Sequence, residues 1–325
     1  MTIRWGILGT GNIANLVASD LQLLPDAEIA AVGSRAQERA DAFGDAFGVP
    51  QRFDSYEALV TKADVDVVHV ASPHPYHVEH ATLALEAGCA VLCEKPLALN
   101  ADGAAQLIAT AREQDEFLME GMWTRFLPVM DDVRRVVADE LGTVQVLRAD
   151  IGFHQPFDPE HRVFNPALGG GALLDLGVYP IALAFELFGR PDNVTSSVVL
   201  GDTGVDEQCA VVFQYDDGMQ AVWQASVRAD AGRTCAIAGP EGRLQGRRAW
   251  WKGAPFDLTR ADGSTETFAR PFEGNGYQFE AAHVMRCLRK GKTESPVMPL
   301  EESHALLQTA DALRQEWGVT YPGEG

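Results

Sequence analysis

The chain is poor in basic residues and in cysteine. Its 325 residues include 26 lysines and arginines against 46 acidic residues, which gives a net charge of −20. A surface of that sign repels phosphate backbones, so we expect no nucleic-acid partner. The five cysteines are scattered and odd in number, and the one close pair, Cys89 and Cys93, is a poor zinc signature. We therefore expect no metal site, and reduced cysteines that act mostly as small buried hydrophobic residues.

Long apolar runs are also scarce. No stretch approaches the roughly 20 residues that span a bilayer, and the first residues, "MTIRWGILGTG", lead directly into a glycine turn instead of forming a secretion signal. These features predict a soluble, cytoplasmic protein that does not bind membranes. The length predicts two domains, because one hydrophobic core seldom organises 325 residues.

The order of the expected elements changes near residue 122. Before it, short apolar strands alternate with helical patterns, which predicts a doubly wound parallel sheet of the Rossmann type. The expected strands are 3–9, 28–33, 64–72, 90–95 and 116–121, and the expected helices are 12–24, 36–48, 75–88 and 101–114. We therefore place an NAD(P)-binding Rossmann domain at residues 1–122.

After this point, several alternating segments follow one another without helices between them. They predict a large, open, mostly antiparallel sheet in a second α/β domain. The expected strands are 143–154, 193–201, 207–215, 218–229, 233–239 and 242–246, and the expected helices are 128–141, 170–188, 276–290 and 300–317. "YDDGMQ" is typical of a hairpin with an Asp-Gly turn. We assign residues 123–325 to substrate binding and dimerisation.

A glycine-rich turn follows the first expected strand. "GILGTGNIA" forms the GxGxxA pattern of dinucleotide sites, in which Ala14 stands for the third glycine. Backbone N–H groups at the start of the next helix would hold the pyrophosphate. The expected contacts are Gly9, Thr10, Gly11, Asn12 and Ile13. A purely structural turn is the alternative.

The second strand ends without the acidic residue that an NAD site usually carries for the ribose 2′-hydroxyl. Gly33-Ser34-Arg35 stands there instead. A hydroxyl and a guanidinium suit a 2′-phosphate through charge-assisted hydrogen bonds. Ser34 and Arg35 therefore predict NADP, with NAD still possible, and a solvent-facing arginine at a helix start is the alternative.

Two further motifs follow in order, "SPHPYH" at 72–77 and "CEKPLALN" at 93–100. With the glycine turn, they make the chain resemble the Gfo/Idh/MocA oxidoreductases over essentially its whole length. The resemblance implies a nucleotide-binding domain followed by an α/β domain with an open sheet. In relatives, the lysine of the Glu-Lys-Pro tripeptide reaches over the nicotinamide, and the peptide before the proline is often cis. The implied cofactor contacts are Ser72, Pro73, His74, His77, Glu94, Lys95 and Trp123. Taken alone, the tripeptide is equally compatible with a solvated surface lysine.

The second half narrows the resemblance. In "GGGALLDLGVYPIAL" (169–183), Asp175 and Tyr179 stand four residues apart, hence on one face of a helix. Many family members have histidine in place of Tyr179. The tyrosine, "EGMWTRFLP" at 120–128 and the segment 274–303 are similar to the dimeric dihydrodiol dehydrogenase branch, which includes NADP-linked D-xylose dehydrogenases. A satisfied helix pair in the core is the alternative reading of Asp175 and Tyr179.

The chemistry implied is reversible hydride transfer between nicotinamide C4 and a hydroxyl-bearing carbon. Tyrosine has a pKa near 10, so Tyr179 needs a neighbouring cation to act as a base, and Lys95 can supply it. Either Lys95 or Tyr179 takes the proton directly, and Asp175 orients the substrate or Lys95. Two rival interpretations stay open: a non-catalytic NADP-binding sensor, and an imine or biliverdin-type reductase.

The expected pocket suits a neutral, polyhydroxylated molecule. Trp123 and Phe153 can form an apolar wall, although either is equally good core, and Arg162 or His154 can contact hydroxyls. We expect a neutral aldose such as D-xylose, oxidised to its lactone, with a trans-dihydrodiol as the close alternative. Apolar alternation in "AVVFQY" and "AVWQASV" predicts a homodimer formed by the open sheet, with a dimer of dimers as a further option.

Overall fold

The computed structural model describes residues 1–324, and their contacts divide the chain into two compact units. The first unit contains Met1–Phe126 and Phe272–Leu307, and the second contains Leu127–Pro271 and the residues from Gln308 onward. The sequence-based division at residue 122 differs from these units, because it assigns 272–307 to the second domain. The division into domains at residue 122 stays a prediction.

The first unit is built on a six-stranded parallel sheet in the order β3-β2-β1-β4-β5-β6. This is the order of the dinucleotide-binding doubly wound fold, in which ligands bind beyond the carboxyl ends of the strands. Its strands are β1 Ile3–Leu8, β2 Ala27–Gly33, β3 Gln51–Phe53, β4 Val67–Val70, β5 Ala90–Glu94 and β6 Leu118–Gly121. β1, β4 and β5 carry almost continuous buried apolar residues, as a sheet covered on both faces requires.

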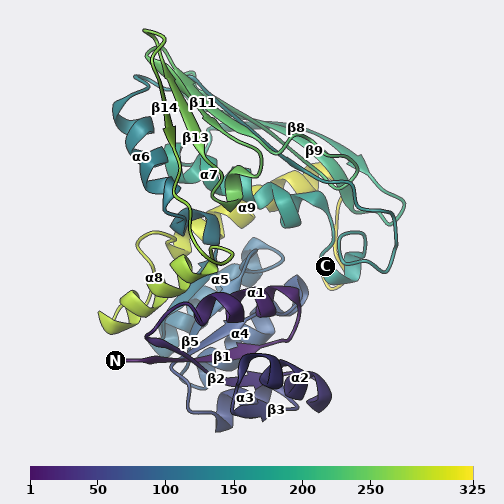
Figure 1. The fold of residues 1–325 in the computed structure, drawn as a ribbon. Coiled ribbons are helices and arrows are strands. Elements are labelled where there is room, and N and C mark those ends of the chain that lie inside the picture. The colour runs from purple at the N-terminus through teal and green to yellow at the C-terminus, as the bar shows by residue number, and fades with distance from the viewer. Residues whose placement is uncertain (325) are drawn as a thin grey trace. The chain divides into compact units, whose positions relative to one another are not determined.

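Helices cover this sheet in two groups (Figure 1). α1 contacts α2 and α8, whereas α3 and α5 both contact α4. The helices are α1 Asn12–Leu21, α2 Gln37–Phe47, α3 Tyr56–Lys62, α4 His77–Glu86, α5 Ala101–Gln114 and α8 Tyr277–Arg289. α8 belongs to this unit although it begins 151 residues after the end of η2 (Trp123–Phe126), which it contacts. The late segment is fixed to α1 by Asp20, whose carboxylate accepts hydrogen bonds from the backbone of Asn275 and Tyr277.

The second unit is built on an eight-stranded sheet in the order β14-β13-β12-β11-β7-β10-β9-β8. Every neighbouring pair is antiparallel except β7 and β10. The strands are β7 Val146–Gly152, β8 Asn193–Leu200, β9 Asp206–Gln214, β10 Gln220–Ser226, β11 Cys235–Gly239, β12 Gly242–Gly246, β13 Phe256–Arg260 and β14 Thr265–Phe268. The expected hairpin joins β9 and β10, and Gly218 takes a positive φ of 90° in its turn.

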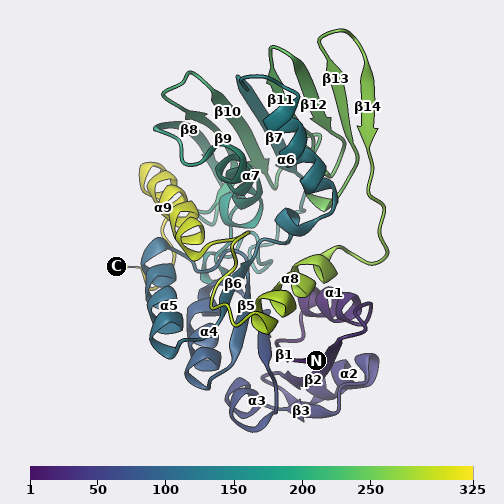
Figure 2. The ribbon, with the colours of Figure 1, turned by 90° about the vertical axis from the view of Figure 1, so that its left-hand side faces the viewer.

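The helices of this unit lie on one face of the sheet. Figure 1 shows the sheet nearly edge-on, with α6 (Val129–Asp139) and α7 (Val178–Phe188) on the same side. Figure 2 shows both helices in front of the strands, and α7 contacts β7 while α6 contacts β12. α9 (Leu300–Trp317) contributes its residues from Gln308 onward to this unit. Within residues 1–324, no helix of the unit covers the opposite face of the sheet.

The fold class expected from the sequence is confirmed, with some local differences. β3, α3, β13 and β14 were not expected, β7 is shorter than predicted, and the helix expected at 170–188 begins with a π-helical turn, Leu173–Gly177. All five cysteines are buried and unpaired. The expectation that no apolar stretch is long enough to span a membrane is wrong for Pro166–Phe188. Because 83% of its most apolar window is buried inside the fold, core packing accounts for this composition.

Candidate active site

The glycine turn lies beyond the carboxyl end of β1, as predicted. Gly9 has a φ of 107°, and a Cβ there would lie 3.0 Å from the carbonyl oxygen of Ala71, so the position requires glycine. A Cβ on Gly11 would meet no atom within 4 Å, and α1 begins at Asn12 without a side-chain cap. The turn therefore leaves open space in front of unpaired helix N–H groups, which fits a pyrophosphate.

Ser34 and Arg35 follow β2 at the same edge of the sheet. Ser34 is buried and its hydroxyl lies 3.5 Å from that of Thr10, whereas Arg35 is exposed. Burial raises the pKa of Tyr56, and the charges of Arg35 and Arg39 oppose that rise. Both guanidinium groups therefore lie near the Tyr56 hydroxyl. The sequence interpretation missed Arg39, although its position four residues after Arg35 was a usable signal.

"SPHPYH" follows β4 and contains the short helix η1, His74–Tyr76. The Ser72 hydroxyl is buried and has no hydrogen-bond partner. A buried polar group without a partner is unusual, and at this edge of the sheet it fits a cofactor ligand. His77 is fully buried, with Nδ1 2.7 Å from the Pro96 carbonyl and Nε2 2.8 Å from the Ser72 carbonyl. It thus links the two segments, and burial lowers the pKa of the ring.

The Glu-Lys-Pro tripeptide ends β5 and is fixed from several sides. The Lys95–Pro96 peptide is cis, and Lys95 is half-buried. Glu94 lies 3.0 Å from His69 Nε2 inside the fold. After the tripeptide, the Leu97 N–H donates to the buried Glu120 carboxylate of β6, at 3.1 Å. Burial raises the pKa of Glu120, and the charge of Lys95 opposes that rise.

α8 and η2 add residues to the same unit. Trp123 is buried, and its ring centroid lies 4.7 Å from that of Tyr277. Glu280 of α8 is 1% exposed, and neither of its carboxylate oxygens has a hydrogen-bond partner. Burial raises the pKa of Glu280 well above its usual value, and the charge of Glu94 acts in the same direction. No sequence pattern marked this carboxyl group, because Glu280 lies 186 residues after Glu94.

In the second unit, the π-helical turn and α7 carry Asp175 and Tyr179, both buried. The Asp175 carboxylate binds Arg162 through two parallel hydrogen bonds, from Nη1 at 2.9 Å and from Nη2 at 3.1 Å. The charge of Asp175 raises the pKa of Arg162, and Tyr179 adds to the rise. Asp175 and Tyr179 therefore approach the same guanidinium, which joins the three residues in one cluster.

Other expected substrate contacts of this unit lie around the end of β7. Phe153 is half-buried and its N–H donates to Ser226, while His154 is exposed and lies 3.0 Å from the Arg228 carbonyl. Trp251, which the sequence interpretation missed, is buried with its ring centroid 6.4 Å from that of Tyr179. The paired tryptophans in "AWWKG" were an available signal. Lys95 belongs to the first unit and Tyr179 to the second, so their joint action is part of the function proposed below.

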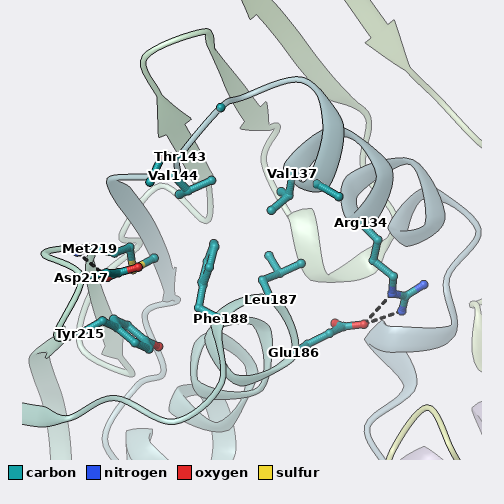
Figure 3. A pocket seen from close by; sticks show the side chains of 12 residues that line it. Arg134, Val137, Thr143, Val144, Glu186, Leu187, Phe188, Tyr215, Asp217 and Met219 are labelled. Atoms are coloured by element: carbon teal, nitrogen blue, oxygen red, sulfur yellow. Dashed lines mark hydrogen bonds and ion pairs between the residues drawn. The ribbon is translucent and has the colours of Figure 1, made fainter.

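A pocket of about 430 Å³ lies elsewhere in the second unit, between α6, the end of α7 and the β9–β10 hairpin (Figure 3). Arg134 and Glu186 form an ion pair at one side, and Phe188 and Tyr215 contribute to its apolar wall. Tyr215 donates from its hydroxyl to the Gly189 carbonyl at 3.1 Å. None of the residues that line this pocket is an expected site residue.

The sheet order, the glycine turn and the unpartnered Ser72 hydroxyl define an NAD(P)-binding oxidoreductase scaffold. Residues 3–122 match the family model described as "Oxidoreductase family, NAD-binding Rossmann fold", and residues 131–245 match the GFO/IDH/MocA C-terminal domain. The chain belongs to the GFO/IDH/MocA oxidoreductase family.

Several known proteins are similar to this chain over almost its full length. Trans-1,2-dihydrobenzene-1,2-diol dehydrogenase from Mus musculus is 38% identical over 335 residues, covering 99% of each chain, and the Homo sapiens enzyme of that name is 36% identical with the same coverage. A solved 3-ketoreductase from Actinomadura kijaniata, in complex with NADP and TDP-benzene, is 27% identical with a TM-score of 0.87, over 97% of this chain and 98% of that chain. An aldose-aldose oxidoreductase from Caulobacter crescentus has the same fold, with a TM-score of 0.89 at 23% identity and 98% coverage of each chain.

Proposed function

We propose that the protein oxidises a neutral diol or aldose with NADP. The Arg162–Asp175 pair carries this proposal, because Asp175 compensates the positive charge of Arg162, which interacts with Tyr179. A pocket with a compensated guanidinium offers hydrogen bonds to hydroxyls and little attraction to a phosphate. The full-length relatives named for a trans-dihydrodiol support the substrate class. A neutral aldose such as D-xylose has adjacent hydroxyl groups, as a trans-dihydrodiol does.

The catalytic residues of the proposal are Lys95, Tyr179 and Asp175. When bound, the nicotinamide supplies C4 as the hydride acceptor. The substrate carbon loses a hydride and its hydroxyl loses a proton, which leaves a carbonyl, or a lactone from an aldose. Tyr179 or Lys95 takes that proton, and the charge of Lys95 stabilises the developing alkoxide. Asp175 holds Arg162 beside Tyr179 and orients the substrate. The solved variants of the A. kijaniata ketoreductase include replacements of a lysine and of a tyrosine.

The cofactor site is formed by three groups of residues at the carboxyl edge of the parallel sheet. Ser34 and Arg35, with Arg39 beside them, hold the 2′-phosphate and select NADP over NAD. The turn at Gly9, Thr10, Gly11, Asn12 and Ile13 holds the pyrophosphate. The remaining contacts are Ser72, Pro73, His74, His77, Glu94, Lys95 and Trp123. The proposed substrate contacts are Trp123 and Phe153 as apolar groups, with Arg162 as the contact of substrate hydroxyls.

The test is the initial rate of NADPH formation with a trans-dihydrodiol, D-xylose, D-glucose, L-arabinose and inositol, each with NADP and with NAD. We expect the diol or a neutral aldose to be oxidised with NADP. Preference for inositol or a sugar phosphate would refute the pocket described here. Tight NADP binding without turnover of any substrate would favour the sensor, and NADPH-dependent reduction of an imine or biliverdin would favour a reductase.

The assembly we propose is a homodimer, with further pairing into a tetramer as a second option. Each chain would contribute the sheet face that α6 and α7 leave uncovered, in an isologous interface. We place the enzyme in the cytoplasm. Five buried, unpaired cysteines agree with a reducing compartment.

A further inference from the structure

Tyr321 contacts the backbone just before the π-helical turn of the second unit. Its hydroxyl donates to the Gly170 carbonyl at 2.6 Å, and the side chain is 3% exposed. Burial raises the pKa of this hydroxyl, which keeps it protonated as a donor. The contact joins positions 151 residues apart in the sequence. Gly170 lies five residues before Asp175 and nine before Tyr179.

The segment that carries Tyr321 is itself held in place. Glu324 binds the buried Arg314 of α9 through both carboxylate oxygens, at 2.7 and 3.0 Å, and accepts a hydrogen bond from the Tyr321 N–H at 3.0 Å. The Arg314 guanidinium also lies over the Tyr321 ring, 4.8 Å from its centroid. An ion pair, a backbone hydrogen bond and a cation–π contact thus fix the orientation of this one side chain.

Asp206 approaches Gly171, the next residue of the chain. Gly171 has a φ of 123°, and a Cβ there would lie 2.2 Å from Asp206 Oδ1 and 3.4 Å from the Tyr321 hydroxyl. Asp206 Oδ2 accepts the Leu173 N–H at 2.6 Å, at the first residue of the π-helical turn. Asp206 and Tyr321 therefore both contact the segment around Gly170 and Gly171, directly before the residues that carry the proposed chemistry.

We propose that Tyr321 is a positioning residue for the active site, which acts through Gly170 on Asp175 and Tyr179. This inference rests on the function proposed above. A π-helical turn departs from regular helical hydrogen bonding and is frequent at functional sites, so its geometry depends on contacts from outside the helix. The loss of one such contact shifts Tyr179 relative to the substrate, and small displacements are costly for catalysis.

The test compares Tyr321→Phe with Tyr215→Phe. Both tyrosines donate to the carbonyl of a glycine, but Tyr215 does so at Gly189, just after the end of α7, in the pocket of Figure 3. We expect Tyr321→Phe to lower kcat about tenfold, from the steep dependence of rate on alignment, with little change in KM or in NADP affinity. Tyr215→Phe should leave kcat within about twofold. Hydrogen exchange of the backbone over residues 170–179 should accelerate only in Tyr321→Phe.

Equal kcat in Tyr321→Phe and in the unmodified protein would overturn the proposal, even if the melting temperature falls. Equal loss of kcat in both variants would also overturn it, because it would indicate general destabilisation. If the unmodified protein oxidises no substrate, the proposed function fails, and the exchange measurement alone decides whether Tyr321 orders residues 170–179. If Tyr321→Phe does not fold, Glu324→Gln, which weakens the support of Tyr321, should produce the same selective acceleration, and normal exchange would refute the inference.

Discussion

In the proposed function, Arg35 is the residue on which the choice of NADP over NAD depends most. Replacing Arg35 with alanine removes a hydrogen bond to a charged group, which is worth roughly 1.5–3 kcal/mol, or about ten- to a hundredfold in affinity. We expect Arg35→Ala to weaken the binding of NADP by that factor and to leave the binding of NAD nearly unchanged. Arg39→Ala should act in the same direction, because Arg39 lies near the same Tyr56 hydroxyl. The measurement is the ratio of kcat/KM for the two cofactors. Equal catalytic efficiency with NADP and NAD in the unmodified protein would contradict the predicted preference for NADP.

In the proposed function, Lys95 and Tyr179 are the residues on which turnover depends most. Lys95→Ala and Tyr179→Phe should each lower kcat by roughly 10²–10⁴, the range for a positioned acid–base group. NADP affinity, measured by fluorescence titration, serves as the control and should change little. Near-normal turnover in Lys95→Ala would show that the tripeptide is not at the reaction centre.

Residue identities were predictable where the motif is contiguous in the chain. The glycine turn, Ser34 and Arg35 follow the ends of β1 and β2, so the sequence alone placed them at one edge of the sheet. The Arg162–Asp175 pair was not predicted, because an irregular segment separates the two residues and no local pattern fixes how it folds. The paired tryptophans marked Trp251 as a candidate, but its contact with Tyr179 depends on how distant segments pack. Arg162 was expected to bind substrate hydroxyls, and its pairing with Asp175 came only from the structure.

At the scale of elements, sequence patterns identified those with a strong apolar period and missed the short or solvated ones. β3 has three half-buried residues, and α3 has seven residues after its Ser55 cap. β14 lies at the sheet edge, and three of its four residues are exposed, so no alternation marked it. The π-helical turn had no local signal, because Asp206 and Tyr321 fix it from outside the helix.

The Asp206 carboxylate, which accepts a hydrogen bond from the first residue of the π-helical turn, should make the stability of the protein depend on pH. Burial raises the pKa of Asp206 to about 7. Between about pH 4 and pH 7, the folded protein therefore keeps a proton on Asp206 that the unfolded chain releases. By linkage, the contribution of this proton to the free energy of unfolding is complete below about pH 4 and is lost as the pH rises toward 7. In the Asp206→Asn variant, the asparagine side chain at this position does not titrate. The melting temperature of the unmodified protein minus that of Asp206→Asn should thus fall between pH 5 and 8.

The control for this measurement is Asp230→Asn. Asp230 is ion-paired with Arg233 and Arg248, and hydrogen bonds from these arginines lower its pKa, so it titrates below that range. Its difference curve should be flat from pH 5 to 8. A flat curve for Asp206→Asn as well would mean that the buried carboxyl group does not titrate as described.

At the scale of the whole molecule, the uncovered sheet face predicts the oligomeric state. Val222 of β10 is 38% exposed on that face and is in register with Val212 of β9 and Arg148 of β7. We expect a mass of twice 35.2 kDa by light scattering at micromolar concentration. Val222→Asp should shift the protein toward the monomer, because it buries a charge in the interface.

Leu23→Asp is the matched control for the interface variant. Leu23 is an apolar residue of similar exposure, 39%, in the first unit. The Leu23→Asp substitution should leave the mass unchanged. A monomeric mass for the unmodified protein would contradict the dimer, and equal dissociation by both variants would show that the sheet face is not the specific interface.

The return of the chain to the first unit at residues 272–307 sets the order in which the protein can fold during synthesis. α8 contacts α1, and Asp20 obtains its hydrogen-bond donors from Asn275 and Tyr277. While the ribosome is still synthesising residues 127–271, Asp20 lacks these donors and the surface of α1 that α8 covers stays exposed. The segment synthesised first therefore reaches its final packing only after about nine-tenths of the chain has emerged, and until then it exposes surface of the kind that chaperones protect.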